Sequence, residues 1–382
     1  MMQDQNPGEL PDGISIVVPT KGRIALTRAL LRSLRIAHEH YAGPSEVIII
    51  DDSAPNERNE LADLCAQFDA IMLPGSVSVG AKRNTGIERA RYNITLFVDS
   101  DCEAEPQLLV EHAKAYQDNG AETVGGCMGP TRFVGPDTWL WETLSHTSYV
   151  MPFSFPDIMS EVPWGPSSNL SFRTRILRQI RGFDETFPPR PGGEDVDLGL
   201  RVIRQGYRIV TNRNAAVRHS KDTWNSLKVM RDRLFQWGRA EHYLHERHPD
   251  RLTLAQPRPL AVFLLVIVIA LIQTLLMHNV LYLGLPFVWA FTSVAIFAAL
   301  TSRYMDRAAP TFAQQALIVL LNQFFESGLI WQGLRRRTIR PVFQTMLYAD
   351  GQLVGEWYHS AYWLISNFLA FTLMGVLILC LG

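Results

Sequence analysis

Apolar residues are distributed very unevenly along this chain of 382 residues, and that asymmetry limits the folds open to it. From Pro259 onward, three runs without Asp, Glu, Lys or Arg occur at about residues 259–278, 281–300 and 361–381. Each is close to the roughly 20 residues that a membrane-spanning helix requires. The sequence therefore predicts three spanning helices in a membrane region over residues 258–382, with buried core helices as the alternative.

A fourth apolar stretch, residues 312–331, is interrupted by polar side chains: Gln314, Gln315, Asn322, Gln323 and Glu326. We expect it to lie along the membrane surface or to dip into it as a re-entrant segment. Basic residues favour the cytosolic side of membrane proteins. The arginine cluster that follows this stretch is therefore predicted to be cytosolic: Arg335, Arg336, Arg337 and Arg340.

Charge and cysteine content restrict the partners and the compartment. The net charge of −1, without basic runs interleaved with aromatic residues, gives no indication of nucleic-acid binding. Residues 1–12 are polar and lack the apolar core of a secretory signal, so we expect a disordered N-terminus and a cytosolic location for the part that follows. The cysteines occur singly, which is typical of a reducing compartment without a zinc site: Cys65, Cys102, Cys127 and Cys380.

Strand-like and helix-like segments alternate in the first half of the chain. Short β-branched runs occupy residues 13–20, 46–53, 71–76 and 93–101. Segments with helical spacing separate them, at residues 26–41, 60–68 and 80–91. This order predicts an α/β domain built on a mainly parallel sheet.

Three acidic clusters stand where this domain would place a ligand. Asp51 and Asp52 end one strand-like run, and Asp99 and Asp101 follow another. Ligands of open α/β sheets bind at the carboxyl ends of the strands. The third cluster follows two glycines in the sequence PGGEDVDLGLR, which allows a loop to present carboxylates. Together the clusters indicate an anionic, metal-bound substrate.

The motifs, taken in order, resemble those of the family 2 glycosyltransferases over residues 13–222. The residues that carry the resemblance are SIVVPT, VIIIDDS, GAKRNTGIERA, FVDSDC, GPSSNLSFRTRILRQIRGFDE and GGEDVDLGLRVIRQGYRI. The resemblance implies a GT-A fold, a nucleotide-diphosphate sugar as donor, with UDP or GDP as the nucleotide, and a divalent cation, Mg²⁺ or Mn²⁺. Carboxylates suit such a cation, which stabilises a diphosphate leaving group.

The resemblance also assigns roles at the donor side. It implies that Asp99 and Asp101 hold the metal, Asp101 most directly, with a ribose contact or a water-mediated link to the metal as the alternatives for Asp99. His219 would be a third ligand, although a lone His is more often not a ligand. Asp52 would read the nucleobase. The other residues implied to contact the nucleotide sugar are Pro19, Thr20, Lys21, Arg23, Arg83, Asn84, Asp99 and Ser100. We expect Arg83 and Asn84 to open a helix, whose N-terminus favours anions.

On the acceptor side, Asp195 matches the general base of an inverting, single-displacement transfer, and Glu194 would orient it or bind the acceptor. A helix N-cap is the alternative for Asp195, and both are compatible. Trp164, Ser168 and Asn169 would form the acceptor wall, with a packing role as the alternative for the tryptophan.

Residues 223–257 have the composition of an amphipathic helix suited to an anionic membrane face, with packing on the domain as the alternative. Within them, Gln236 and Arg239 match the Gln-x-x-Arg-Trp motif of processive synthases and are expected at the acceptor site. Ala240 stands in place of the tryptophan, which argues against polymerisation.

The apolar runs, together with the resemblance, predict a membrane-anchored inverting glycosyltransferase of the cytoplasmic membrane, multi-pass and with its catalytic domain in the cytosol. It would act on a lipid-linked or other cell-envelope acceptor. The alternatives are a processive polysaccharide synthase of the same family, a sugar nucleotidyltransferase, and a non-catalytic membrane assembly protein.

Overall fold

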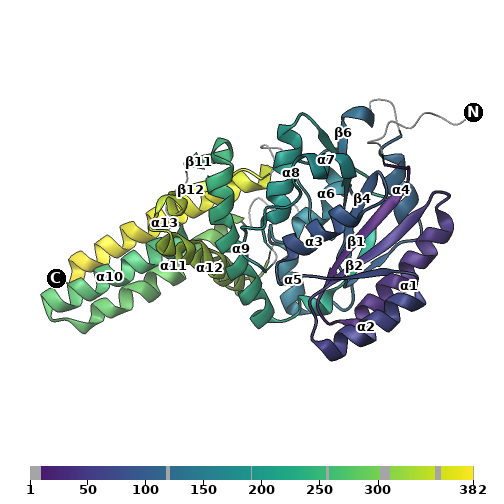
Figure 1. Ribbon diagram of the computed structural model, residues 1–382. Coiled ribbons are helices and arrows are strands. Elements are labelled where there is room, and N and C mark those ends of the chain that lie inside the picture. Colours follow the sequence, from purple (N-terminus) through teal and green to yellow (C-terminus); the bar gives the residue numbers. More distant parts are fainter. Residues whose placement is uncertain are drawn as a thin grey trace, which may run out of the picture. The chain divides into compact units, whose positions relative to one another are not determined.

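The computed structural model describes residues 10–117, 121–190, 192–254, 258–301, 310–348 and 354–381 (Figure 1). Most of the predicted N-terminal segment, residues 1–9, lies outside this description. The chain divides into two compact units. One comprises Met1–Asp137 with Ser148–Asn225, and the other comprises Thr138–Thr147 with Ser226–Gly382.

The first unit is built on a seven-stranded sheet in the order β3-β2-β1-β4-β8-β6-β9. Pairing is parallel from β3 to β4, β8 is antiparallel to both of its neighbours, and β6 pairs parallel with β9. This mostly parallel sheet confirms the predicted α/β class. The strands are β1 Ile14–Thr20, β2 Ser45–Asp51, β3 Ile71–Pro74, β4 Ile94–Val98, β6 Val124–Met128, β8 Asn169–Arg173 and β9 Arg208–Thr211.

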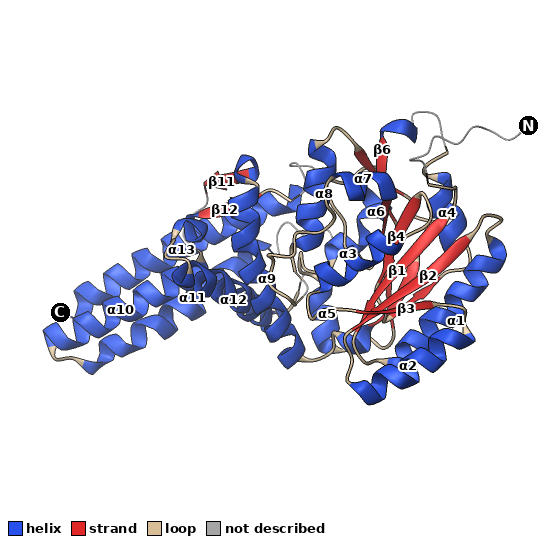
Figure 2. Cartoon of the chain, viewed as in Figure 1, coloured by secondary structure: helices blue, strands red, loops and turns tan. Residues whose placement is uncertain are grey.

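Helices cover both faces of this sheet (Figure 2). Alternate residues of β1 point to opposite faces: Ile16 belongs to the core shared with α1, whereas Val17 lies so close to Gly86 of α3 that a Cβ there would collide with it. Burial on both sides explains why β1 is wholly apolar or small up to Thr20. The helices are α1 Ile24–His40, α2 Pro55–Gln67, α3 Val79–Arg89, α4 Leu108–Lys114, α6 Phe155–Ile158, α7 Thr174–Gln179 and α8 Glu194–Arg204.

A smaller sheet in the same unit has the order β5-β10-β7. Its strands are β5 Cys102–Ala104, β7 Thr131–Val134 and β10 Val217–Ser220. His219 of β10 pairs with Cys102, directly after the Asp99–Asp101 segment. The small sheet therefore brings a residue from the end of the unit to the end of β4.

The second unit is mainly helical. Its α9 and α12 cross at two glycines, because a Cβ at Gly238 would collide with the carbonyl oxygen of Phe325, and one at Gly328 with that of Phe235. A short antiparallel pair joins β11 Leu252–Leu254 to β12 Gln344–Met346. The helices are α5 Trp139–Ser145, α9 Leu227–Arg247, α10 Pro259–Met277, α11 Leu285–Thr301, α12 Phe312–Arg335 and α13 Val354–Leu381.

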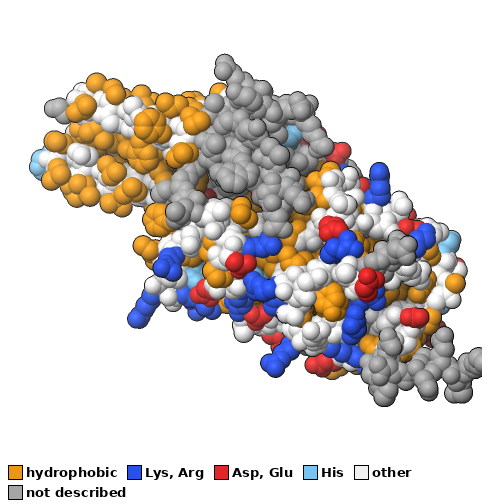
Figure 3. Space-filling view, turned by 90° about the horizontal axis from the view of Figure 1, so that it is seen from above, with side chains coloured by type: hydrophobic (Ala, Val, Ile, Leu, Met, Phe, Trp, Pro, Cys, Tyr) orange, Lys and Arg blue, Asp and Glu red, His pale blue; other side chains and the backbone are white. Residues whose placement is uncertain are grey.

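Among the described residues, two helical segments are long and apolar enough to cross a membrane, Pro259–Met277 and Val280–Ala299. Several of their large side chains are exposed, such as Leu275 at 73% and Phe287 at 78%, whereas Tyr282, Trp289 and Phe297 are buried. Figure 3 shows hydrophobic side chains dominating the surface of this helical end. In the third predicted span, α13, the apolar part described is Asn367–Cys380.

The stretch predicted to lie on or dip into a membrane, residues 312–331, is part of one unbroken helix, α12. A capping box starts it, since Gln314 N donates to the Thr311 hydroxyl and the Gln314 side chain accepts from Thr311 N. Its interrupting polar residues Gln314, Gln315 and Glu326 are buried. These three polar side chains thus pack within the unit, whereas Asn322 and Gln323 are half-buried.

Candidate functional site

The donor-side residues gather where β1, β2 and β4 end. Thr20 lies opposite Asp51 in the parallel register, so the carboxyl ends of β1 and β2 are level. After β1 the chain turns through Gly22 and Arg23, both left-handed with φ 61°. Thr20 stabilises this turn by donating its hydroxyl to Gly22 O at 3.2 Å. The turn places Lys21 and Arg23 beside the acids that follow β2 and β4.

Asp52 lies between two lysines. Its Oδ2 is 3.1 Å from Lys21 Nζ, and its Oδ1 accepts from Lys82 Nζ, which also donates to Thr20 O at 2.7 Å. Burial opposes ionisation of Asp52, but the two ammonium groups outweigh it and lower its pKa. Lys82 is 5% exposed and was missed by the sequence reasoning, which had singled out only its neighbours Arg83 and Asn84.

Asp101 is shared between a guanidinium and an imidazole. Its Oδ2 is 2.6 Å from Arg23 Nη1, and its Oδ1 is 3.3 Å from His219 Nε2. Although burial opposes it, the hydrogen bond and charge of His219, together with Arg23, lower the pKa of Asp101 to about 2. Burial lowers the pKa of His219, but Asp101 outweighs it, so the net shift is upward.

The potential metal ligands near the end of β4 are Asp101, Cys102 and His219, whose ligand atoms all lie within 4.8 Å of one another. Burial raises the pKa of the Cys102 thiol well above its usual value, which disfavours the thiolate that binds metals. A carboxylate and an imidazole remain; the carboxylate is the kind of ligand that Mg²⁺ and Mn²⁺ take, whereas the imidazole suits transition metals better than Mg²⁺. Asp99, the other predicted ligand, instead directs its Oδ1 to Arg83 Nη2 at 3.2 Å.

Arg83 joins the second and third acidic clusters. Its Nη1 is 2.8 Å from Glu194 Oε1, and the side chains of both residues are 4% exposed. Glu194 Oε2 also accepts from Gly192 N at 2.7 Å, which closes the loop before α8. Gly193 makes this turn with φ 82°, a conformation that favours glycine.

The expectation that Arg83 and Asn84 open a helix is wrong. Helix α3 begins at Val79, because the Ser78 hydroxyl accepts from Ala81 N at 3.4 Å and caps it. Both residues therefore lie beyond the first turn, away from its free N–H groups. Asn84 bonds Phe183 N and O and Glu185, which gives no support to a nucleotide contact.

Asp195 lies in the first turn of α8. Its Oδ1 accepts from Val196 N at 2.9 Å and its Oδ2 from Ser167 N at 3.4 Å. Burial, and then the charge of Glu194, raise the pKa of Asp195 to about 7, against the opposing effect of Arg83. A carboxylate with a pKa near neutrality can take up a proton from a hydroxyl at physiological pH.

The remaining predicted residues are placed as follows. Ser100 is buried, Pro19 lies within β1, and the Ser168 hydroxyl pairs with that of Thr131 at 2.9 Å. Trp164 is 8% exposed and packs edge-on against Phe155. These positions do not test the predicted contacts of Pro19 and Ser100 with the donor or of Trp164 and Ser168 with the acceptor, which stay predictions.

Asn169 is fully buried, and its amide donates to Pro130 O and Ala215 O while its Oδ1 contacts His112. This placement favours a structural role over acceptor binding. Gln236 and Arg239 belong to the second unit, where Arg239 Nη1 donates to Gln236 Oε1 at 3.0 Å and its Nε to Gln332 Oε1 at 3.2 Å.

Part of the α/β unit is similar in sequence to known proteins. Residues 15–179 match the family described as "Glycosyl transferase family 2". The α/β unit is similar to that family over these residues. A "Pre-mycofactocin glycosyltransferase" of Mycobacterium tuberculosis is 26% identical over 246 residues, 62% of this chain and 48% of the relative. A "Glucosyl-dolichyl phosphate glucuronosyltransferase" of Haloferax volcanii is 25% identical over 186 residues, 46% of this chain and 59% of the relative.

The chain thus spans about half the length of the curated relatives it matches. Among solved structures, a mannosyltransferase from Pyrobaculum calidifontis in complex with GDP-Man and Mn²⁺ has 14% identity and a TM-score of 0.45, covering 95% of this chain and 90% of that one. The α/β unit carries the first two acidic clusters at the ends of β2 and β4, as the sequence predicted, and the third at the start of α8.

Proposed function

We propose that this chain is a membrane-anchored, inverting glycosyltransferase that moves a sugar from a nucleotide diphosphate to a lipid-linked or other cell-envelope acceptor. The observation that carries the proposal is that Asp52, Asp101 and Asp195, all in the α/β unit, each have a different electrostatic environment. Two of them are held ionised and the third is poised near neutrality. That division separates binding of an anionic donor from proton removal.

At the donor side, Lys21, Lys82 and Arg23 supply positive charge beside Asp52 and Asp101. Asp52 and its lysines would contact the nucleoside, as the family motif implies. A divalent cation held by Asp101 and His219, with Asp99 nearby, would stabilise the charge that the diphosphate acquires as it leaves. Arg83 would keep the end of β4 and the start of α8 together during this step.

At the acceptor side, the Asp195 carboxylate would remove the proton from the attacking hydroxyl. The oxygen then forms its bond to the anomeric carbon as the bond from that carbon to the diphosphate breaks, so one displacement inverts the configuration. Two backbone N–H groups hold the carboxylate, from Ser167 and Val196, and fix its direction. Glu194 contributes by raising the basicity of Asp195 through its negative charge.

A membrane location is supported by the outward-facing apolar side chains of Pro259–Met277 and Val280–Ala299. The relative from Haloferax volcanii is named for a lipid phosphate substrate, which favours a lipid-linked acceptor here. Ala240 in place of the expected tryptophan favours a single transfer over processive synthesis.

The test is incubation of the purified full-length protein, in lipid, with a panel of labelled UDP- and GDP-sugars and a membrane lipid extract. We expect release of nucleotide diphosphate and one labelled lipid-soluble product. A ladder of products would mean a processive synthase, pyrophosphate exchange would mean a nucleotidyltransferase, and no turnover by folded protein would mean a non-catalytic role.

A further inference from the structure

The C-terminal end of α12 exposes large apolar side chains next to arginines. Trp331 is 50%, Leu334 64% and Ile339 66% exposed. Three exposed arginines lie between and beside these apolar residues. We call the three apolar residues and the three arginines together the basic–apolar patch: Trp331, Leu334, Arg335, Arg337, Ile339 and Arg340. An apolar cluster interleaved with cations is unusual on a surface that faces only water.

The arginines of this region fall into two kinds. Arg336 is used within the unit, because its Nη1 is 2.8 Å from Glu246 Oε2 and its guanidinium stacks 4.4 Å from the centre of the Tyr243 ring. The side chains of Arg335, Arg337 and Arg340 make no hydrogen bond or ion pair with any residue in the described part of the chain. Their charges are therefore available to an external anion.

The basic–apolar patch is tied to the point where the first apolar helix begins. Arg258, the residue before α10, donates its N–H to Val342 O at 3.2 Å and its Nη2 to Gln344 O at 2.9 Å. Leu260 N, in the first turn of α10, donates to Glu326 Oε2 of α12 at 2.7 Å. In the sequence, the basic–apolar patch lies between Glu326 and Val342, and both of these residues bond to the start of α10. These hydrogen bonds hold the patch beside the first apolar helix.

We propose that the basic–apolar patch is a docking surface for the anionic phospholipid headgroups that surround the entry of α10 into the bilayer. Trp331, Leu334 and Ile339 would lie at the level of the headgroups, and Arg335, Arg337 and Arg340 would contact phosphates. The proposal rests on the membrane location proposed above, but not on glycosyl transfer.

The chemistry favours lipid over a soluble acidic partner. Tryptophan and aliphatic residues beside arginines match the interface of a bilayer, where one side is apolar and the other carries phosphate. Each basic residue near an anionic membrane surface contributes about 1 kcal/mol, which is about a fivefold preference. Neutralising all of these arginines should therefore reduce selection of anionic lipid by at least tenfold.

The experiment uses lipid contact as its measurement. In the full-length protein with Cys380→Ser, which removes the exposed cysteine and leaves Cys65, Cys102 and Cys127 buried, Ile339→Cys carries a fluorophore. The protein is placed in phosphatidylcholine nanodiscs that contain brominated phosphatidylcholine or brominated phosphatidylglycerol as quencher. The same label at Ile36→Cys, an exposed position of α1, serves as the reference in the α/β unit.

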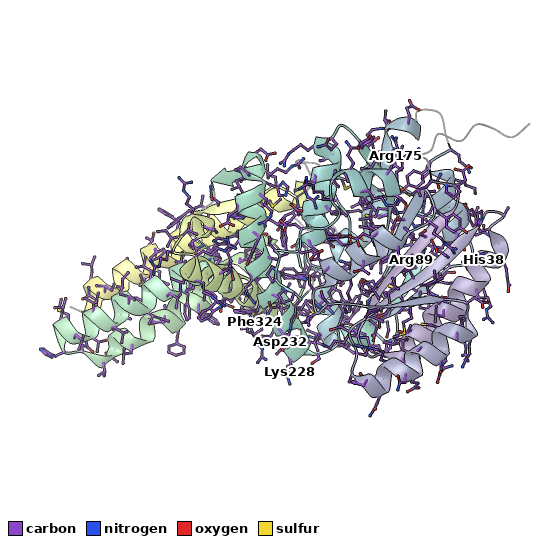
Figure 4. All side chains as sticks on the ribbon, in the orientation of Figure 1. His38, Arg89, Arg175, Lys228, Asp232 and Phe324 are labelled. Carbon is purple, nitrogen blue, oxygen red and sulfur yellow. The ribbon has the colours of Figure 1, made fainter. Side chains whose placement is uncertain are left out.

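We expect quenching at position 339 by both lipids, at least tenfold more effective per molecule for phosphatidylglycerol, and none at position 36. Arg335→Gln with Arg337→Gln and Arg340→Gln should abolish the preference. The matched control changes three exposed arginines of the α/β unit, Arg32, Arg89 and Arg175, two of which are labelled in Figure 4, and should retain it.

Two results would overturn the proposal. Absence of quenching by either lipid would show that the basic–apolar patch does not touch the bilayer, and equal quenching by both would show that it does not select anions. Neither readout depends on turnover, so a protein without transferase activity can still pass or fail this test.

Discussion

Arg83 holds Glu194 and Asp99 at the same time, with Nη1 2.8 Å from Glu194 Oε1 and Nη2 3.2 Å from Asp99 Oδ1. The two carboxylates belong to different acidic clusters of the sequence and to different ends of the proposed reaction. One buried guanidinium therefore connects the segment that follows β4 with the start of α8.

Arg83→Gln should lower both stability and turnover. Removing one partner of a buried ion pair leaves a buried charge uncompensated, which costs about 3–5 kcal/mol. We expect a lower thermal unfolding midpoint and a loss of activity that Arg83→Lys restores only in part, because a lysine cannot reach both carboxylates with a planar fork. Arg89→Gln, at an exposed position of the same helix, should change neither, and equal effects of the two variants would contradict the account.

The pH dependence should report Asp195. Its pKa is raised to about 7 by burial and by Glu194, so the base is increasingly protonated below neutrality and kcat/KM should fall about tenfold per pH unit there. Glu194→Gln removes a negative neighbour, which should shift this limb to lower pH. A profile that is flat between pH 5 and 8 would assign the base elsewhere.

The same shift has a consequence for stability. The ordinary Asp pKa in an unfolded chain is about 3.9, so between pH 4 and 7 the native state holds a proton that the unfolded state has lost. The free energy of unfolding should therefore decrease as pH rises through this window, and Asp195→Asn should remove that contribution. Thermal unfolding of wild type and variant at pH 5 and pH 8 measures it, and a variant with the same pH slope as wild type would argue against it.

The crossing of α9 and α12 should tolerate no side chain at its two glycines. Gly238→Ala or Gly328→Ala places a methyl group against a backbone carbonyl, so the helices must separate, and we expect destabilisation of a few kcal/mol. Gly375→Ala in α13 meets nothing within 4 Å and is the matched control. Unfolding midpoints that are equal for all three variants would contradict the close crossing.

Metal dependence should follow from Asp101. Chelation of divalent cations should abolish transfer, with Mn²⁺ or Mg²⁺ restoring it, and Asp101→Asn should weaken donor binding because it removes the charged oxygen ligand. A transfer assay with and without chelator measures the first effect. Calorimetric titration of wild type and Asp101→Asn with the nucleotide sugar, with and without cation, measures the second. Full activity in excess chelator would remove the cation from the proposal.

The sequence predicted the sheet well because short β-branched runs, two of which lead into acids, leave few alternatives for β1, β2 and β4. It placed this helix at residues 80–91, one residue from its start at Val79, but the expectation that Arg83 and Asn84 open the helix overlooked the capping residue Ser78. Lys82 could have been considered as the basic residue directly before Arg83 in the segment GAKRNTGIERA. The buried role of Asn169 could not, because its partner His112 lies 57 positions away and meets it only in the folded unit.

The helical unit shows a similar division. The apolar runs located α10 and α11 closely, since length and composition suffice for such helices. The sequence could not show that α12 packs within the unit, because composition does not reveal that Gln314, Gln315 and Glu326 are buried against other residues. Helix α5, far from the others in sequence, joins this unit through tertiary contacts alone.

The most direct test of the account is the turnover of Asp195→Asn with a donor sugar that wild type accepts, measured as nucleotide diphosphate released per enzyme, together with the dissociation constant for that donor. The amide keeps the shape of the side chain and loses its basicity, so we predict donor binding within about twofold of wild type and turnover reduced by roughly 10² or more. Turnover near the wild-type rate, in a variant that is folded and binds the donor, would contradict the claim that Asp195 is the base.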